Sequence, residues 1–242
     1  MAELASTFNA MLDRLAAAFA TQQAFVDDAG HELRTPITIV RGHLELLGDD
    51  ADERRDTVAL VTDELDRMSR IVDDLLLLAK LEHPGLLRTE TVAVEPFTEE
   101  LFAKARTFGD RRWALESTAA VTIVADPQRL TQAVLNLARN AVDHAGPDAA
   151  ISLGSAASHG EVRFWVADTG TGIAEHERAA VFERFTRGGD RRRRSEGAGL
   201  GLAIVRAVAE AHAGTVELDS GPGGGSRFTL TIPTDPPGAP GP

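Results

Sequence analysis

A histidine in a long, alanine-rich N-terminal stretch has the neighbours that a nucleophile needs. His31 is followed directly by Glu32, and Thr35 and Pro36 lie about one turn further along. A neutral imidazole is a competent nucleophile near pH 7, and a carboxylate beside it can hold and then take the proton of its other nitrogen. An isolated helical histidine is usually an ordinary surface residue, so this interpretation depends on the whole run from Phe25 to Pro36.

Two asparagines form a second group of interest. Asn136 and Asn140 are four residues apart, so their amides share one face of a helix. Amide oxygens are hard, neutral ligands that Mg2+ accepts together with water and ATP phosphates. Taken alone, the pair fits a capping or interhelical role better than a metal site.

Two glycine-rich segments have the residue types that meet a nucleotide. Asp168 ends a strand-like run and precedes Gly170 and Gly172. Its carboxylate can accept a hydrogen bond from an exocyclic amine, and glycines let the backbone approach a planar base, although a plain turn explains the pattern equally well. Residues 197–202 open a helix, where free backbone N–H groups favour phosphate. A dinucleotide fold would place such glycines after a first strand, whereas these follow a loop.

That loop carries four consecutive arginines, Arg191 to Arg194. One interpretation is a solvated loop. The other is a lid that closes over a triphosphate, with one guanidinium reaching the γ-phosphate. The sequence does not say which arginine would make that contact.

Two long helices are expected to position His31. The first covers residues 1 to about 47 and contains Pro36, which removes one hydrogen bond and kinks a helix. The second covers 53 to about 82, after a turn at 48–52, and carries an apolar heptad seam: Val58, Val61, Leu65, Met68, Val72, Leu75 and Ala79. A second copy completing a four-helix bundle would bury this seam. The alternative is a hairpin packed on the rest of its own chain.

The rest of the chain mixes helices with strands. Helices are expected at 97–107, 127–145, 175–185 and 199–213, and strands at 113–115, 121–124, 150–154, 161–168, 215–219 and 226–232. Because these elements do not alternate simply, an α/β sandwich with a mixed sheet is favoured over a doubly wound fold. The predicted fold class is therefore α+β, a helical hairpin followed by a sandwich. Residues 84–95 are expected to link the two domains, and residues 235–242 to form a disordered tail.

The composition excludes several function classes. A formal net charge of −12 opposes binding to nucleic-acid phosphates, so no nucleic-acid partner is expected. The absence of cysteine excludes disulfides and thiolate metal sites. No apolar run approaches the ~20 residues that cross a bilayer, and no signal-peptide pattern opens the chain. The chain as given is therefore expected to be soluble.

Together, these motifs resemble those of sensor histidine kinases. The matching segments, in the family's order, are the phosphoacceptor motif at 30–36, the asparagine box at 136–140, the first glycine box at 168–173, the phenylalanine box at 182–185, the second glycine box at 197–202 and the closing glycine box at 223–228. Residues 1–20 resemble the last helix of a HAMP signal-relay module. The implied ATP-binding domain has the GHKL, or Bergerat, fold.

The resemblance implies a role for each matched residue. His31 is the phosphoacceptor, Glu32 assists it, and Thr35 helps to position water that dephosphorylates the partner. Asn140 is the principal Mg2+ ligand, and Asn136 supports the metal or the phosphates. The implied nucleotide-binding set, in which Asp168 reads the adenine amino group, is Asn136, Asn140, His144, Asp168, Gly170, Gly172, Gly197, Gly199, Leu200 and Gly201.

Three positions depart from the family pattern. Ser226 stands where Thr is common. Gly30 stands where Ser or Ala is commoner, and glycine costs roughly 1 kcal/mol of helix propensity against Ala. Asp143 stands where Lys is frequent, and a carboxylate there would repel phosphate. Either Arg139 or an arginine of the lid replaces that lysine, or the Asp143 carboxylate points away.

The implied activity is autophosphorylation of His31 by ATP with Mg2+, followed by phosphoryl transfer to an Asp of a response-regulator receiver domain. Residues 21–83 would form the dimerisation and phosphotransfer domain of a homodimer, and residues 96–234 the ATP-binding domain. Because a HAMP module normally follows a membrane span, the chain is expected to be the cytoplasmic portion of a membrane-anchored sensor.

Three rival functions stay open. The protein could act mainly as a phosphatase of its regulator, through Glu32 and Thr35. It could be a scaffold that binds ATP without transferring phosphate, an alternative that Asp143 and Gly30 favour. It could also be a gyrase-like or mismatch-repair ATPase, but such enzymes use a Glu where this chain has Asn136, and they lack the His31 motif.

Overall fold

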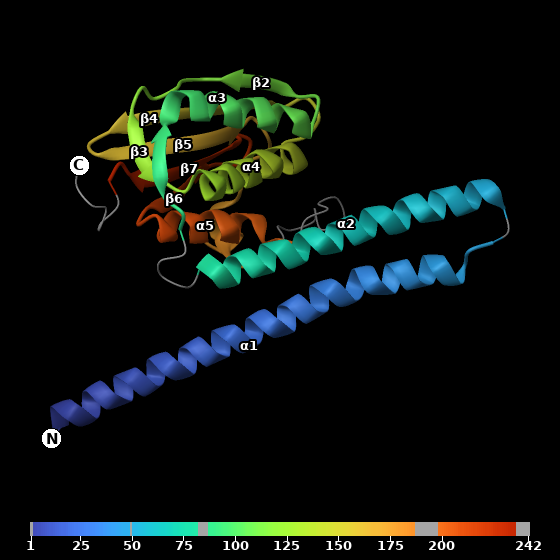
Figure 1. Ribbon diagram of the computed structural model, residues 1–242, viewed down its shortest axis with the longest axis horizontal. Coiled ribbons are helices and arrows are strands. Elements are labelled where there is room, and N and C mark those ends of the chain that lie inside the picture. Colours follow the sequence, from blue (N-terminus) through green and yellow to red (C-terminus); the bar gives the residue numbers. More distant parts are fainter. Residues whose placement is uncertain (1, 49, 82–86, 187–197, 236–242) are drawn as a thin grey trace. The chain divides into compact units, whose positions relative to one another are not determined.

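The computed structural model describes residues 2–48, 50–81, 87–186 and 198–235. It divides into two compact units, residues 1–72 and 73–242. The first is helical and the second combines helices with a sheet (Figure 1). No helix among the described residues is both long and apolar enough to span a membrane. The expected tail after residue 235 and the expected end of the second helix near residue 82 lie outside the described ranges.

One helix, a short turn and most of a second helix make up the first unit. Helix α1 (Ala2–Glu45) continues through Pro36, and α2 (Ala51–Leu81) runs back in the opposite direction (Figure 1). Asp50 caps α2, because its carboxylate accepts the N–H groups of Asp52 and Glu53 at 2.8 and 3.1 Å. These bonds hold the pKa of Asp50 below its ordinary value. Both predicted helices are confirmed.

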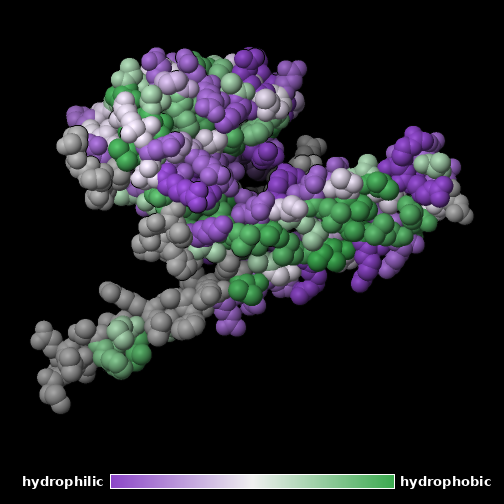
Figure 2. Space-filling model, in the orientation of Figure 1, coloured by the Kyte–Doolittle hydropathy of each residue, from purple (hydrophilic) through white to green (hydrophobic). Residues whose placement is uncertain are grey.

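The heptad seam of the hairpin is open in the single chain. On α2, Val58, Leu65 and Val72 are 59%, 49% and 40% exposed. On α1, Ile37 and Leu44 are 51% and 50% exposed. Each set repeats at seven-residue spacing, which aligns its members along one side of a helix. The apolar surface over the two helices is visible in Figure 2.

Two sheets form in the second unit. The larger has the strand order β2 (Arg112–Leu115), β4 (Ala150–Ser158), β5 (Glu161–Asp168), β7 (Ser226–Pro233) and β6 (Thr215–Ser220). Its β2–β4 pair is parallel and its other pairs are antiparallel. The smaller sheet pairs β1 (Glu90–Ala93) with β3 (Thr122–Ala125). The predicted mixed sheet is confirmed, and part of the expected linker lies in β1.

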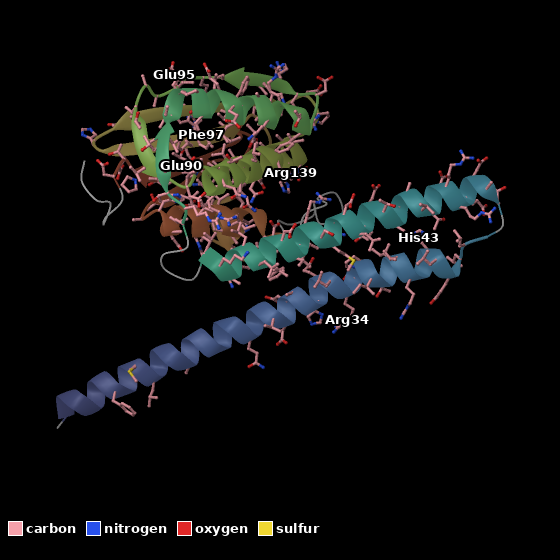
Figure 3. The ribbon with its side chains drawn as sticks, viewed as in Figure 1. Arg34, His43, Glu90, Glu95, Phe97 and Arg139 are labelled. Carbon is pink, nitrogen blue, oxygen red and sulfur yellow. The ribbon has the colours of Figure 1, made fainter. Side chains whose placement is uncertain are left out.

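Helices cover one face of the larger sheet. Burial alternates strictly along β7, so one side of this strand is packed more tightly than the other. The covering helices are α3 (Val94–Ala105), α4 (Pro127–His144) and α5 (Gly201–Ala211), with the short 3-10 helix η1 (Arg106–Phe108) after α3. Phe97 points from α3 towards the sheet (Figure 3), and its ring meets that of Phe164 edge-on with centroids 6.0 Å apart. This apolar layer supports the site described next.

One predicted element is wrong. Residues 175–185 form two single 3-10 turns, η2 (Glu175–Glu177) and η3 (Ala180–Phe182), rather than one α-helix. The Phe182 ring packs against that of Phe228 in β7, with ring centroids 6.0 Å apart. Burial of this ring against the sheet outweighs the weak helical preference of a polar eleven-residue segment.

Candidate active site

The predicted phosphoacceptor lies on an exposed side of α1. His31 is exposed, Glu32 is half-buried and Thr35 is exposed. The Thr35 hydroxyl donates to the His31 carbonyl at 3.4 Å, a long bond. All three side chains are carried by the backbone of α1. A Cβ built on Gly30 would meet nothing within 4 Å, so the glycine is not required by packing in the single chain.

Helix α4 carries the asparagine pair. Asp126 caps it, because its Oδ1 accepts the Arg129 N–H at 3.1 Å. One side of the helix is buried in the core: Leu130, Ala133, Val134, Leu137, Ala138 and Ala141. Asn136 and Asn140 lie at the edge of that side and are half-buried. Both side chains are therefore partly accessible to a ligand.

The second glycine box lies against the asparagine box. The Asn136 Nδ2 group donates to the Gly201 carbonyl at 3.4 Å, across 65 residues of sequence. Leu200, only 1% exposed, anchors the start of α5 in the core. This contact uses the amide nitrogen, so the oxygen of Asn136 is the atom suited to a cation or to water. The N-terminal turn of α5 thus lies beside the asparagine face.

The first glycine box lies at the other end of α4. Asp168 ends β5, and its Oδ1 accepts the Gly170 N–H at 2.7 Å. A Cβ on Gly170 would come within 2.8 Å of the Ala145 Cα, so only glycine fits where this loop meets the end of α4. The half-buried Asp168 and the half-buried His144, in the last turn of α4, belong to this same region.

The closing glycine box packs on the first one. Gly172 has φ +69°, and a Cβ there would overlap the Gly221 carbonyl. The Gly223 N–H donates to the Thr171 carbonyl at 2.8 Å. Ser226 pairs with Asp168 in the β5–β7 register. The first and closing boxes, more than 50 residues apart in sequence, therefore form one loop assembly.

The phenylalanine box touches the second glycine box. The Phe185 N–H donates to the Gly199 carbonyl at 3.0 Å. Glu183 binds Arg206 of α5 in a 3.1 Å ion pair. These contacts join the two ends of the segment that holds the predicted arginine lid. The lid itself, Arg191–Arg194, and Gly197 lie outside the described residues.

Asp143 stands where the family often has a lysine, and the structure shows this residue and its neighbour Arg139. Asp143 is exposed on α4. The guanidinium of Arg139 lies 4.7 Å from the centroid of the Phe108 ring, a cation–π contact with η1 (Arg139 is labelled in Figure 3). In the unliganded chain, Arg139 thus contacts η1.

Sequence reasoning missed His212, which braces the start of α4. It is 3% exposed, its Nε2 accepts the Asp126 N–H at 3.1 Å, and its Nδ1 lies 2.8 Å from the Val208 carbonyl. Nδ1 therefore carries the proton. Burial lowers the pKa of His212, outweighing the Val208 bond and the charge of Asp126. The available signal was a histidine directly after an apolar helix, where side chains cap carbonyl groups.

The donor set fits Mg2+ bound together with a nucleotide. Asn136 and Asn140 supply two neutral amides on one helix face. Among the described residues, no group of three or more His, Cys, Asp or Glu side chains could hold a metal ion by itself. Mg2+ typically takes few protein ligands and keeps waters and substrate phosphates. Two amides beside the start of α5 match that pattern.

Comparisons with known proteins agree with this geometry. The family model "Histidine kinase-, DNA gyrase B-, and HSP90-like ATPase" matches residues 125–236. The "His Kinase A (phospho-acceptor) domain" model matches residues 21–84. The second range contains His31, and the first contains both asparagines and all the glycine boxes. The chain thus combines an acceptor domain with an ATPase domain.

Relatives show the same combination. The chain is 39% identical to the probable sensor histidine kinase TcrY of Mycobacterium tuberculosis, over 96% of this chain and 52% of TcrY. It also matches the crystal structure of the ATP-binding domain of PrrB from Mycobacterium tuberculosis, with a TM-score of 0.50 and 32% sequence identity. The match covers 60% of this chain and 97% of that one.

A third match is the structure of the histidine kinase ThkA in complex with the response regulator protein TrrA. It is 25% identical with a TM-score of 0.68, over 85% of this chain and 59% of that one. The chain spans about half the length, or less, of the first curated relatives that it matches. On these matches and on the assembled motifs, the chain belongs to the sensor histidine kinases of two-component signalling systems.

Proposed function

We propose that this chain binds Mg-ATP at α4 and α5 and transfers the γ-phosphoryl group to His31. One observation carries the proposal. The two ends of the Asn136–Asn140 face are closed by separate segments, Gly201 at one end and the Asp168 loop, through Ala145, at the other. A triphosphate and its base need this kind of elongated cradle, with phosphate at a helix N-terminus and adenine at a carboxylate.

Each part of the cradle has a role in binding. The Asp168 carboxylate accepts a hydrogen bond from the adenine amino group. The first turn of α5 offers backbone N–H groups to phosphate. When bound, Mg2+ would be held by Asn140 with help from Asn136, and it would neutralise phosphate charge. One arginine of the 191–194 segment contacts the phosphates, and His144, which lies beside the Asp168 loop, is part of the nucleotide site.

The chemical step takes place on α1. A ring nitrogen of His31 forms a bond to the γ-phosphorus, the bond to the bridging oxygen breaks, and ADP leaves with that electron pair. The proton on the other ring nitrogen passes to Glu32. Transfer requires the attacking nitrogen and the leaving oxygen to lie in line, and the exposure of His31 permits this approach.

The phosphorylated histidine then transfers its phosphoryl group to an Asp of a response-regulator receiver domain. This partner is inferred from family membership and from the complex that ThkA forms with TrrA. The chain also works as a homodimer, because the open seam on α1 and α2 needs an apolar partner. Replacing Leu65 by Asp is expected to shift the chain to monomer in analytical ultracentrifugation.

Phosphatase activity towards the regulator is a second candidate function. The exposed Thr35 hydroxyl lies near Glu32 on α1, and its own bond to the His31 carbonyl is long, so it can orient a water. Decay of the phosphorylated regulator should slow several-fold with Thr35→Ala while autophosphorylation persists. Equal decay with both proteins would exclude this role.

We also propose that this chain is part of a larger protein, and the length of its relatives supports this. Curated sensor kinases are about twice as long as this chain. Residues 1–20 are the last helix of a HAMP module in this proposal, and the chain is the cytoplasmic part of a membrane-anchored sensor. Residues 21–83 are the dimerisation and phosphotransfer domain, and residues 96–234 the ATP-binding domain.

Autophosphorylation is the experiment that tests the function. The chain is incubated with γ-labelled ATP and Mg2+, beside His31→Gln and the matched control His43→Gln, a second histidine of α1 (Figure 3). Acid-labile label is expected on the wild type and on the His43 variant but not on the His31 variant. Label that persists in His31→Gln would mean that the acceptor is another residue. Binding of ATP without any label would favour the scaffold.

A further inference from the structure

Ser220, the last residue of β6, lies at the junction of the loops that form the adenine end of the proposed site. It is 8% exposed, and it belongs to no motif that the sequence analysis singled out. Its hydroxyl lies within hydrogen-bond distance of three groups. These are the Ile173 N–H at 2.8 Å, the Gly225 carbonyl at 2.8 Å and the Ser226 hydroxyl at 3.0 Å.

The direction of these bonds follows from counting hydrogens. A hydroxyl has one donor and two acceptor sites. The Gly225 carbonyl can only accept, so Ser220 gives it its single proton. The Ile173 N–H and the Ser226 O–H must then both donate to the Ser220 oxygen. All three sites of the Ser220 hydroxyl are therefore used, and the Ser226 proton is directed towards Ser220.

These bonds join two segments that are far apart in sequence. Ile173 ends the loop that starts at Asp168, and it lies 47 residues before Ser220. At its other end the loop is fixed by β5 and by the Gly170 bond to Asp168. The Gly225 backbone packs directly on the Asp168 carbonyl. Ser220 thus fixes the free end of the loop to the same turn that supports Asp168.

We propose that Ser220 is a positioning residue for adenine recognition, which holds the Asp168–Ile173 loop in the conformation that binds ATP. This inference rests on the proposed function, since it assumes that the loop binds the adenine base. The hydroxyl touches neither the phosphates nor His31 in this role. Its loss should weaken nucleotide binding and leave the transfer step intact.

Ser220→Ala tests the proposal in the full chain. The variant leaves the half-buried Ile173 N–H and the Gly225 carbonyl without this partner. The KM for ATP is expected to rise about tenfold, the effect of one to two lost hydrogen bonds. The rate of autophosphorylation at saturating ATP should stay within about twofold of the wild type. The matched control is Ser117→Ala, which removes a hydroxyl bonded to the Ser155 carbonyl at 2.9 Å, remote in the fold from this loop.

A second readout separates positioning from general stability. ITP carries an oxygen where ATP carries the amino group that Asp168 is proposed to read. Titration calorimetry with ATP and with ITP, each with Mg2+, gives the two dissociation constants. The dissociation constant for ITP divided by that for ATP should fall several-fold in Ser220→Ala and stay constant in Ser117→Ala.

The outcomes are distinct. A raised KM with an unchanged saturating rate and a reduced ATP-to-ITP preference would support the proposal. An unchanged KM would overturn it, and so would a loss of rate and melting temperature with the base preference kept. A wild-type chain that binds no ATP would instead overturn the proposed function, and this inference with it.

Discussion

The acceptor helix and the nucleotide site are built in opposite ways. On α1, His31, Glu32 and Thr35 lie within five residues and are held by one helix backbone. The nucleotide site draws on α4, α5, the end of β5, the β6–β7 turn and the 3-10 segment, which join through backbone contacts. Substitutions on α1 should therefore act locally, whereas those in the nucleotide site should spread to neighbouring segments.

The largest expected effect comes from Gly172→Ala. The new Cβ would overlap the Gly221 carbonyl, and the residue would keep a left-handed φ that costs about 1–3 kcal/mol. We expect ATP affinity to fall about 100-fold, measured by titration calorimetry. Gly160→Ala is the control, because Gly160 also has a positive φ, +79°, but its Cβ would meet nothing within 4 Å. It should lower stability by about 1 kcal/mol and leave ATP binding unchanged. Equal losses in both variants would mean that backbone strain alone matters.

The two helix caps give the next largest contrast. Asp126, 4% exposed, caps α4 and also accepts the Arg88 N–H at 2.9 Å. Asp126→Ala leaves two backbone donors without this partner, so the free energy of unfolding of its domain should fall by about 2–3 kcal/mol in denaturant titrations. Asp50→Ala removes an exposed cap of α2, whose N–H groups water can reach, and should cost less. An equal loss of unfolding free energy in the two variants would contradict the contrast between the two regions.

The contrast also explains what the sequence could predict. The two long helices, the helix at 127–145 and the strand at 226–232 follow local patterns, and each has the predicted form. The role of Ser220 depends on a partner 47 residues away, and no local pattern indicates it. For His212 the only local signal is its place after an apolar helix, because the backbone that it braces lies 86 residues away. The segment 175–185 was wrongly predicted as a helix because Phe182 is placed by a contact with β7. Chemistry carried by one helix is therefore easier to predict from the sequence than chemistry assembled by loops.

A pH dependence should separate the two regions. Burial holds the pKa of His212 below its ordinary value near 6.5, so the folded ATP-binding domain binds fewer protons than the unfolded chain. The stability that depends on neutral His212 is complete above about pH 6.5 and is lost as the pH falls through the lower, folded-state pKa. The wild type should therefore lose more stability between pH 7 and 5 than His212→Gln, in paired urea titrations. Parallel curves for the two proteins would show that His212 is not the titrating group.

The smallest effect is expected from Gly30→Ala. Nothing lies within 4 Å of the added methyl, and Ala favours a helix by up to about 1 kcal/mol over Gly. Gly30 also precedes Ile37 and Leu44 at seven-residue spacing, so the methyl would extend the apolar seam of α1. The hairpin should melt at a higher temperature by circular dichroism, with autophosphorylation within about twofold of the wild type. Gly42→Ala, equally free of contacts, is the matched control. If both variants were more stable and only Gly30→Ala slowed the reaction, a loosened helix beside His31 would be part of the mechanism, and the acceptor region would be less independent of its backbone than its exposure indicates.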